Sequence, residues 1–264
     1  MPRLRLFEIH DQPWFPEFLR REVVDGLQMV LEATNAYHPI ARRLRDAITR
    51  TGTSKVLDLF SGAGGPWPSL VREFAADGAK PVEVFLTDRY PSAVNRNGDA
   101  SGQAERIHFI AESIDANEIP ERLAGFRTVF SSFHHFNSAD ARRFLEDSAS
   151  RRRGVGVFEV ASRHTLTILS ILFIPLLNWL VTPFRRPFRW SRLLWTYLIP
   201  IVPFVLLFDG LASCLRSYSL ADLHKLTNGV APADYQWEIG EENGGLIPIR
   251  VTYLIGFPQS RRTE

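Results

Sequence analysis

The hydrophobic positions of this chain follow two alternating patterns. Short apolar runs rich in β-branched and aromatic residues predict strands at residues 56–60, 81–87, 106–111, 128–133, 155–160, 235–240 and 247–256. Between them, apolar residues recur at helical spacing, which predicts helices at residues 16–33, 39–49, 68–74, 138–150 and 220–226. The chain is long enough for one sizeable α/β domain of this kind with a modest insertion.

The first predicted strand runs into a glycine-rich turn and then into a helix. Gly62 and Gly64 allow the backbone to take positive φ, and they let a ligand approach without meeting a Cβ atom. The free N–H groups of the following helix face the same place. Asp58 lies inside the strand just before the turn, where a carboxylate can hold the ammonium group of an amino acid. A pyrophosphate ligand would gain nothing from that negative charge.

The glycine turn and Asp58 together resemble the cofactor motif of a known enzyme family. From residue 54 to residue 257 the chain is similar to the class I S-adenosylmethionine-dependent methyltransferases. The resemblance implies S-adenosyl-L-methionine as cofactor. It also implies a Rossmann-like, doubly wound, mostly parallel seven-stranded sheet with an antiparallel last strand. The turn departs from the dinucleotide-binding fingerprint, because no glycine stands where its third should fall and Pro66 occupies the first helical turn.

Further cofactor-binding candidates follow from the same resemblance. Asp88 closes the second strand, where a carboxylate can accept both hydroxyl protons of a ribose, but it could equally cap a helix after Pro91. Asp115 matches the residue that reaches the adenine amine, although an Asp before Asn117 is also an ordinary turn residue. The expected cofactor-binding residues are Asp58, Ser61, Gly62, Gly64, Asp88, Arg89, Ser113, Asp115 and Ser131.

His134 and His135 follow the fourth strand, at the edge where open α/β sheets bind their ligands. We expect them to line the methyl-transfer site as catalytic candidates, since an imidazole can remove the proton of a hydroxyl or ammonium acceptor. Either histidine could instead hydrogen-bond the backbone and only shape the pocket. No metal is expected, because two adjacent side chains at a strand end seldom converge on one ion.

Nucleic-acid acceptors are not indicated. Enzymes that methylate the amino groups of adenine and cytosine generally carry an Asp or Asn, two prolines and an aromatic residue after the fourth strand, and this chain has none. The enzymes that methylate the cytosine ring need a cysteine after a proline, and Cys214 has no such context. The net charge is only +2 and the arginines are scattered.

Residues 164–213 form an apolar insertion that a minimal methyltransferase does not need. The uncharged run 166–184 is just long enough to span a bilayer, whereas the run 193–208 is shorter and is broken by Pro200 and Pro203. A spanning hairpin would carry four arginines to the far side, against the positive-inside tendency. A helix pair lying on the membrane is favoured, with its tryptophans at headgroup depth and its arginines on anionic lipid. The alternative is a lid over an apolar substrate or a dimer interface.

The expected organisation has three parts. Residues 1–53 form a helical cap, residues 54–163 and 214–264 form the cofactor-binding domain, and residues 164–213 form the insertion. Tyr37 and His38 are candidates for a lid in the cap, or they simply join two helices. The single Cys214 excludes a disulfide framework and a cysteine-rich zinc site, and the first apolar run is too short for a signal peptide. We therefore expect a cytoplasmic protein, with the inner face of the membrane as its place of action.

The function predicted from the sequence is transfer of a methyl group from S-adenosyl-L-methionine to an oxygen or nitrogen of a lipophilic small molecule or lipid, at or near a membrane. Two alternatives stay open. One is a membrane-associated scaffold that binds the cofactor without catalysis, and the other is a protein or RNA methyltransferase. A homodimer is also left open by the apolar insertion.

Overall fold

A computed structural model describes residues 3–62, 64–89, 91, 106–185, 188–243 and 250–259. Ala63 of the glycine turn, the helix considered after Pro91 and the start of the last expected strand lie outside these residues. The expected site residues from Asp58 to His135 all lie within the part of the chain that is described.

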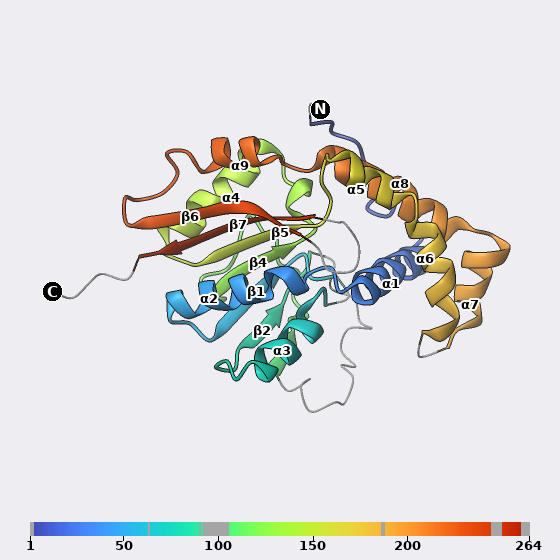
Figure 1. Ribbon diagram of the computed structural model, residues 1–264, viewed down its shortest axis with the longest axis horizontal. Coiled ribbons are helices and arrows are strands. Elements are labelled where there is room, and N and C mark those ends of the chain that lie inside the picture. The colour runs from blue at the N-terminus through green and yellow to red at the C-terminus, as the bar shows by residue number, and fades with distance from the viewer. Residues whose placement is uncertain are drawn as a thin grey trace.

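A seven-stranded sheet in the order β3-β2-β1-β4-β5-β7-β6 forms the centre of the molecule (Figure 1). Strands β1 to β5 pair in parallel, and β7 runs antiparallel to both β5 and β6. The strands are β1 (Lys55–Leu59), β2 (Glu83–Leu86), β3 (Ile107–Phe109), β4 (Phe126–Phe130), β5 (Val155–Glu159), β6 (Tyr235–Asn243) and β7 (Arg250–Pro258). The predicted mostly parallel sheet with an antiparallel last strand is therefore confirmed.

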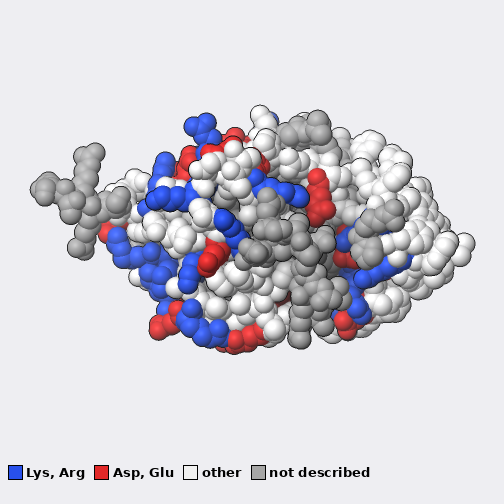
Figure 2. Space-filling model, turned by 90° about the horizontal axis from the view of Figure 1, so that it is seen from below, with Lys and Arg blue, Asp and Glu red and all other residues white. Residues whose placement is uncertain are grey.

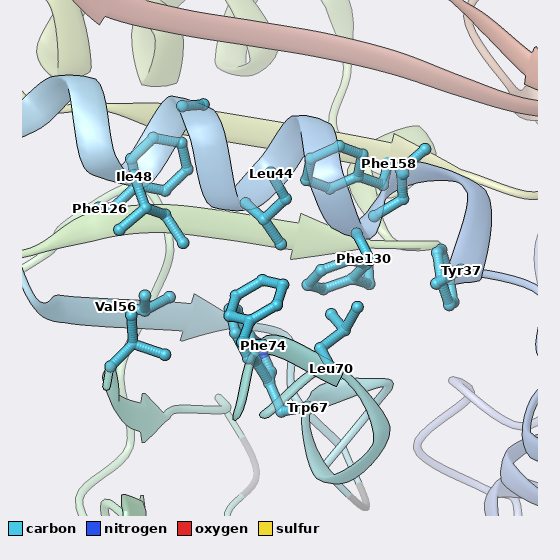
Figure 3. Close-up of a cluster of buried hydrophobic side chains, with 14 of the residues drawn as sticks. Tyr37, Leu44, Ile48, Val56, Trp67, Leu70, Phe74, Phe126, Phe130 and Phe158 are labelled. Carbon is cyan, nitrogen blue, oxygen red and sulfur yellow. The ribbon is translucent and has the colours of Figure 1, made fainter. Parts of the chain in front are cut away.

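Helices cover both faces of the sheet: α2 (Ala41–Thr51) and α3 (Trp67–Ala76) on one, α4 (Ser138–Ser150) and α9 (Leu220–Thr227) on the other. Side chains alternate along each strand, so Val56 packs toward α2 and α3 while Leu57 packs toward α4 and α9. Figure 3 shows the first of these cores, in which Leu44, Trp67 and Phe126 are fully buried.

The remaining helices gather at one end of the molecule, beyond the edge at which the parallel strands end (Figure 1). They are α1 (Glu17–Thr34), α5 (Thr165–Ile171), α6 (Ile174–Val181), α7 (Trp190–Leu193) and α8 (Ile201–Arg216), with a 3-10 turn at Thr182–Phe184 and a π-helical turn at Leu194–Leu198. Leu19 and Val23 of α1 share an apolar core with Val202 and Leu206 of α8. The expected cap and the expected insertion therefore pack together through one apolar core.

No single helix in the described residues is long and apolar enough to cross a membrane. Two pairs that are bent at a short break meet the criteria of length and composition together: Thr165–Ile171 with Ile174–Phe184, bent by 40°, and Trp190–Leu198 with Ile201–Arg216, bent by 69°.

Several of the expected strands have other bounds than the observed ones, and two of them lead to the candidate site. The fourth was expected at residues 128–133, but β4 ends at Phe130 because Ser131 takes a positive φ and Phe133–His135 form a 3-10 turn. The third was expected at residues 106–111, but β3 covers only Ile107–Phe109.

Candidate functional site

The turn after β1 is built from left-handed backbone. Gly62 and Gly64 take φ values of 50° and 110°, which residues with a side chain rarely adopt. Ser61 ties the turn to the next strand, since its hydroxyl donates to the Asp58 carbonyl at 2.9 Å and accepts from the Thr87 N–H at 3.1 Å. The expected residues Ser61, Gly62 and Gly64 therefore lie in one hydrogen-bonded turn between the ends of β1 and β2.

The end of β2 delivers Asp88 to the same turn. Oδ2 of Asp88 accepts the Gly62 N–H at 3.0 Å, and the Asp88 carbonyl accepts the Ile114 N–H at 3.0 Å. The carboxylate is only half-buried, so it also borders solvent. Asp88 thus stands between the glycine turn and the loop after β3, at a position from which it can accept hydrogen bonds from a ligand.

The other candidates from the second and third strand ends lie beside Asp88. The Ser113 hydroxyl donates to the Arg89 carbonyl at 2.6 Å, and the Arg89 guanidinium is 3.9 Å from the Asp115 carboxylate. Asp115 also accepts the N–H of Asn117 at 2.9 Å, which is the turn contact that the sequence allowed as its alternative role. The structure therefore brings Asp88, Arg89, Ser113 and Asp115 to one edge of the sheet.

Asp58 lies beneath the turn and not on its open face. Its side chain is 1 % exposed, and Oδ1 accepts the Thr128 hydroxyl of the neighbouring strand β4 at 2.6 Å. Burial raises the pKa of Asp58 to about 7. Its backbone carbonyl accepts hydrogen bonds from the hydroxyls of Ser61 and Thr87. Asp58 supports the turn through these contacts.

Two residues at neighbouring strand ends hold strained backbone. Phe60 after β1 and Ser131 after β4 take φ values of 57° and 44°, a region that costs a residue with a side chain about 1–3 kcal/mol. The Ser131 hydroxyl lies 2.6 Å from the hydroxyl of Tyr37, and the Phe60 ring stacks on His135 with 6.4 Å between centroids. Strain of this kind gathers at functional sites, so both outliers mark this edge of the sheet.

His134 is buried between two carboxylates. Its Nδ1 is 2.8 Å from Oε2 of Glu159, its Nε2 is 3.2 Å from Oε1 of Glu8, and the side chain is 2 % exposed. Burial lowers the pKa of His134, but the charge and hydrogen bonds of Glu159 and Glu8 outweigh it and raise the pKa to about 10. Because both ring nitrogens face carboxylates, neither is directed at an acceptor.

His135 is the histidine that lies beside the glycine turn. Its side chain is 24 % exposed, and one face of the ring stacks on Phe60. Nδ1 of His135 is 3.1 Å from Asp11 Oδ2, and Nε2 is 3.6 Å from Glu8 Oε2. Of the two predicted histidines, His135 is therefore the one placed to meet a ligand at this edge.

The sequence did not single out the N-terminal residues that complete this cluster. Glu8, His10 and Asp11 come from a segment that the sequence places only within the cap of residues 1–53. The Asp209 carboxylate accepts the Ile9 N–H at 2.6 Å and pairs with Nδ1 of His10 at 2.7 Å, which fastens the segment to α8. The available signal was three ionisable residues close together among aromatic ones.

No protein-family model and no curated protein matches the sequence. Solved structures match it in fold. The mitomycin 7-O-methyltransferase MmcR has a TM-score of 0.52 and 15% identity, with 92% of this chain and 58% of that chain covered. The pyocyanin biosynthetic protein PhzM has a TM-score of 0.53 and 16% identity, with 90% of this chain and 60% of that chain covered. The fold is that of the class I methyltransferases.

The chain spans little more than half the length of the two similar structures. Its helix α1 lies over the glycine turn: a Cβ added to Gly62 would stand 3.8 Å from Val24, and the Gln28 amide donates to the Gly65 carbonyl at 2.7 Å. Tyr37 reaches the site through Ser131, whereas His38 pairs with Glu73 of α3 at 2.8 Å. The first helix of the expected cap therefore covers the turn, and His38 points elsewhere.

Proposed function

We propose that this chain is a methyltransferase that uses S-adenosyl-L-methionine. One observation carries the proposal: on a class I fold, the Asp88 carboxylate is held by the Gly62 N–H across the ends of two adjacent parallel strands. The residues fit the cofactor, because Gly62 and Gly64 present no Cβ to a ligand at the turn. A second carboxylate, that of Asp115, follows the next strand end, where it can accept an amine proton.

Each candidate residue has a task in the proposal. When bound, the cofactor supplies a methyl group on a positively charged sulfur. The turn residues hold its amino-acid end, Asp88 and Arg89 its ribose, and Ser113 and Asp115 its adenine. Asp58 supports the turn from beneath, and Ser131 borders the cofactor at the end of β4. His135 faces the acceptor, while His134 fixes the position of the 3-10 turn that carries both histidines.

The proposed acceptor is an oxygen or nitrogen of a lipophilic small molecule or lipid. MmcR is named as a 7-O-methyltransferase of mitomycin and PhzM as a biosynthetic protein for pyocyanin, both of which are small organic molecules. The site edge also offers aromatic surface, since Phe60 stacks on His135 and packs edge-on against Phe136. These features support a small apolar acceptor that carries one polar group.

We further propose that the helical end of the molecule lies on a lipid surface, at the inner face of the cytoplasmic membrane. Most of the exposed large apolar side chains of the described residues fall between residues 166 and 204, and Figure 2 shows a broad uncharged surface at this end. Phe184 and Trp190 are 82 % and 77 % exposed. Monomeric soluble proteins rarely expose continuous apolar surface of this extent. The protruding shape suits a bilayer better than it suits a groove in a protein partner.

The arginines of this region do not all support membrane binding as the sequence suggested. Arg185 pairs with Asp25 of α1 at 3.1 Å, and Arg192 pairs with Glu22 at 3.3 Å. These two guanidiniums anchor α1 to the insertion, so the expectation that they meet anionic lipid is wrong. The membrane proposal therefore depends on the apolar side chains, and the exposed Arg189 remains as a cation at the surface.

Calorimetric titration with S-adenosyl-L-methionine and S-adenosylhomocysteine tests the cofactor. We expect the wild type to bind both, and Asp88→Asn to bind at least about tenfold more weakly, because charge-assisted hydrogen bonds to the ribose are lost. Asp77→Asn, which changes an exposed carboxylate paired with Arg45, serves as the matched control and should bind like the wild type. A wild type that binds neither ligand, or an Asp88→Asn variant with unchanged affinity, would overturn the proposal.

Sedimentation with phosphatidylcholine vesicles containing anionic phosphatidylglycerol tests the membrane surface. We expect the wild type to sediment with the vesicles and the double variant Phe184→Ser, Trp190→Ser to stay in the supernatant. Leu6→Ser, an exposed apolar position outside the insertion, is the control. Sedimentation of the double variant like the wild type would refute the lipid surface. So would a stable dimer that the double variant loses, since the apolar face would then belong to a second copy.

A further inference from the structure

We propose that Glu8, His134 and His135 form a binding site for a divalent transition-metal ion. Each residue offers one ligand atom, and these atoms lie within 4.8 Å of one another. The sequence argued against a metal because adjacent side chains at a strand end seldom converge. Here the 3-10 turn after β4 directs both imidazoles toward one carboxylate, which comes from the N-terminal segment.

The spacing of these atoms also matches that of ligands around one metal ion. Nε2 of His134 is 3.2 Å from Glu8 Oε1, and Nε2 of His135 is 3.6 Å from Glu8 Oε2. The second distance is too long for a hydrogen bond. Ligands bonded at about 2.0–2.1 Å to one tetrahedral ion lie about 3.4 Å apart, close to both values. Two imidazoles and one carboxylate form the donor set of catalytic zinc and of non-haem iron sites.

The opposite nitrogen of each imidazole is already held by a carboxylate. Nδ1 of His134 is 2.8 Å from Glu159, and Nδ1 of His135 is 3.1 Å from Asp11. Histidines that bind metals usually donate their other N–H to such a group, which fixes the ring and leaves Nε2 for the ion. Both rings are therefore oriented as metal ligands before any ion arrives.

The charge of the cluster also favours a cation. Four carboxylates meet here, those of Glu8, Asp11, Glu159 and Asp209, and the Arg216 guanidinium lies 3.3 Å from Glu8. The carboxylates outnumber the guanidinium around Glu8, which is 3 % exposed, so the surrounding negative charge would stabilise a bound divalent ion.

A second set of ligand atoms, from Glu8, His10 and Asp11, is less suitable. Nδ1 of His10 is held by Asp209 at 2.7 Å and lies 4.0 Å from Glu8, while its Nε2 faces Asp11 at 3.4 Å, so both nitrogens already contact aspartates. The site of Glu8, His134 and His135 also adjoins Phe60 at the glycine turn. An ion there would lower the pKa of an acceptor hydroxyl. That consequence depends on the proposed function, whereas the metal site itself does not.

The test measures metal content directly. Purified chain is stripped with a chelator, dialysed against Zn²⁺ or Co²⁺ and then against metal-free buffer, and its metal is determined by mass spectrometry. We expect about one equivalent of metal per chain in the wild type. His135→Asn, which removes one ligand, should retain at least tenfold less metal. Asp11→Asn, which removes only the outer partner of His135, should weaken the affinity for the metal by about 10–100-fold.

His164→Asn is the matched control, because His164 is an exposed histidine paired with Glu241 at 2.9 Å outside the cluster. It should retain metal like the wild type. His135 is partly exposed, so circular dichroism and titration with S-adenosyl-L-methionine of the same samples separate lost metal from lost fold or lost cofactor binding. A folded wild type that holds less than about a tenth of an equivalent would overturn the metal site, as would equal metal in the wild type and His135→Asn.

Discussion

The sheet and the helical end of this molecule differ in how far their side chains are buried and hydrogen-bonded. Every residue of β4 and β5 is buried, and buried carboxylates there have partners, as in the contacts of Asp58 with Thr128 and of Glu159 with His134. At the helical end, Phe184 and Trp190 are exposed to solvent. There, within the described residues, the Asn178 amide is buried without a hydrogen-bond partner.

This difference separates a region that buries its apolar side chains from a region that leaves many of them exposed. The sheet needs nothing further to bury its apolar residues. Helices α5 to α8 leave many large apolar side chains exposed, which is the observation behind the proposed lipid surface. Substitutions at five positions test the contrast: two in the sheet, two at the helical end and one at the start of a helix that packs on the sheet.

The largest effect is expected in the core of the sheet. Phe126→Ala removes a fully buried ring and should lower the free energy of unfolding by about 3–5 kcal/mol. Phe184→Ala should change it by less than about 0.5 kcal/mol in water, because that ring already contacts solvent. Urea denaturation of both variants measures the two effects. Equal losses would abolish the contrast, since Phe184 would then pack within the fold.

The second test concerns the pH dependence of Asp58. Its pKa in the folded state, about 7, lies above the value of about 3.9 in the unfolded chain. The favourable contribution of the protonated carboxyl is thus complete below about pH 4 and is lost as the pH rises to about 7. Asp58→Asn cannot ionise, so the fall in stability from pH 4 to pH 8 should be up to about 4 kcal/mol smaller than in the wild type.

Denaturation of both proteins at the two pH values checks this expectation, and other titrating groups cancel in the comparison. If the free energy of unfolding falls equally in the wild type and in Asp58→Asn, the carboxyl is not desolvated as its position implies.

At the helical end, replacing a buried polar residue by an apolar one should increase stability. The Asn178 side chain is 1 % exposed and packs where a Cβ on Gly26 would meet its amide nitrogen at 2.8 Å. An amide buried without partners costs about 1–3 kcal/mol, so Asn178→Leu should raise the free energy of unfolding by about 1–2 kcal/mol. Asn178→Asp, which buries a charge instead, should lower it. A loss of stability in the leucine variant would indicate that the amide has a partner in solution.

The smallest effect is expected at the start of α9. Ser219 and Asp222 form a reciprocal capping box, as their spacing in the sequence predicts. Ser219→Ala should lower stability by about 1 kcal/mol, and Ser219→Asp should restore most of it because aspartate also caps helices well. Thermal denaturation of the two variants measures the difference. If Ser219→Ala does not lower stability, tertiary packing alone holds this helix on the sheet.

The parts of the fold that local pattern determines could be predicted from the sequence. The glycine turn, the strand that ends at Asp88 and the capped helix after Ser219 each follow from residues a few positions apart. The strand end at Phe130 could not be placed, because the apolar pattern continues through Phe133 while the backbone turns at Ser131. Periodicity does not report a positive φ at a residue other than glycine.

Of the histidine cluster, only the two histidines could be predicted from the sequence, for a similar reason. His134 and His135 could be named because they follow a strand, but Glu8 contacts His134 across a separation of 126 residues. Nothing near Glu8 indicates that its carboxylate is buried. The cofactor assignments of Asp88 and Asp115 remain predictions, although the structure brings their side chains to the same sheet edge as the turn.

The attachment of the N-terminal segment bears on the order of events during synthesis. Arg3 donates to the carbonyls of His134, Phe136 and Arg216, and the Leu4 N–H donates to the Leu215 carbonyl. Residues 3–11 leave the ribosome long before these partners, so they must wait, undocked, until α8 has emerged. A nascent chain released before that point would carry a complete glycine turn without the carboxylate of Glu8 beside its histidines.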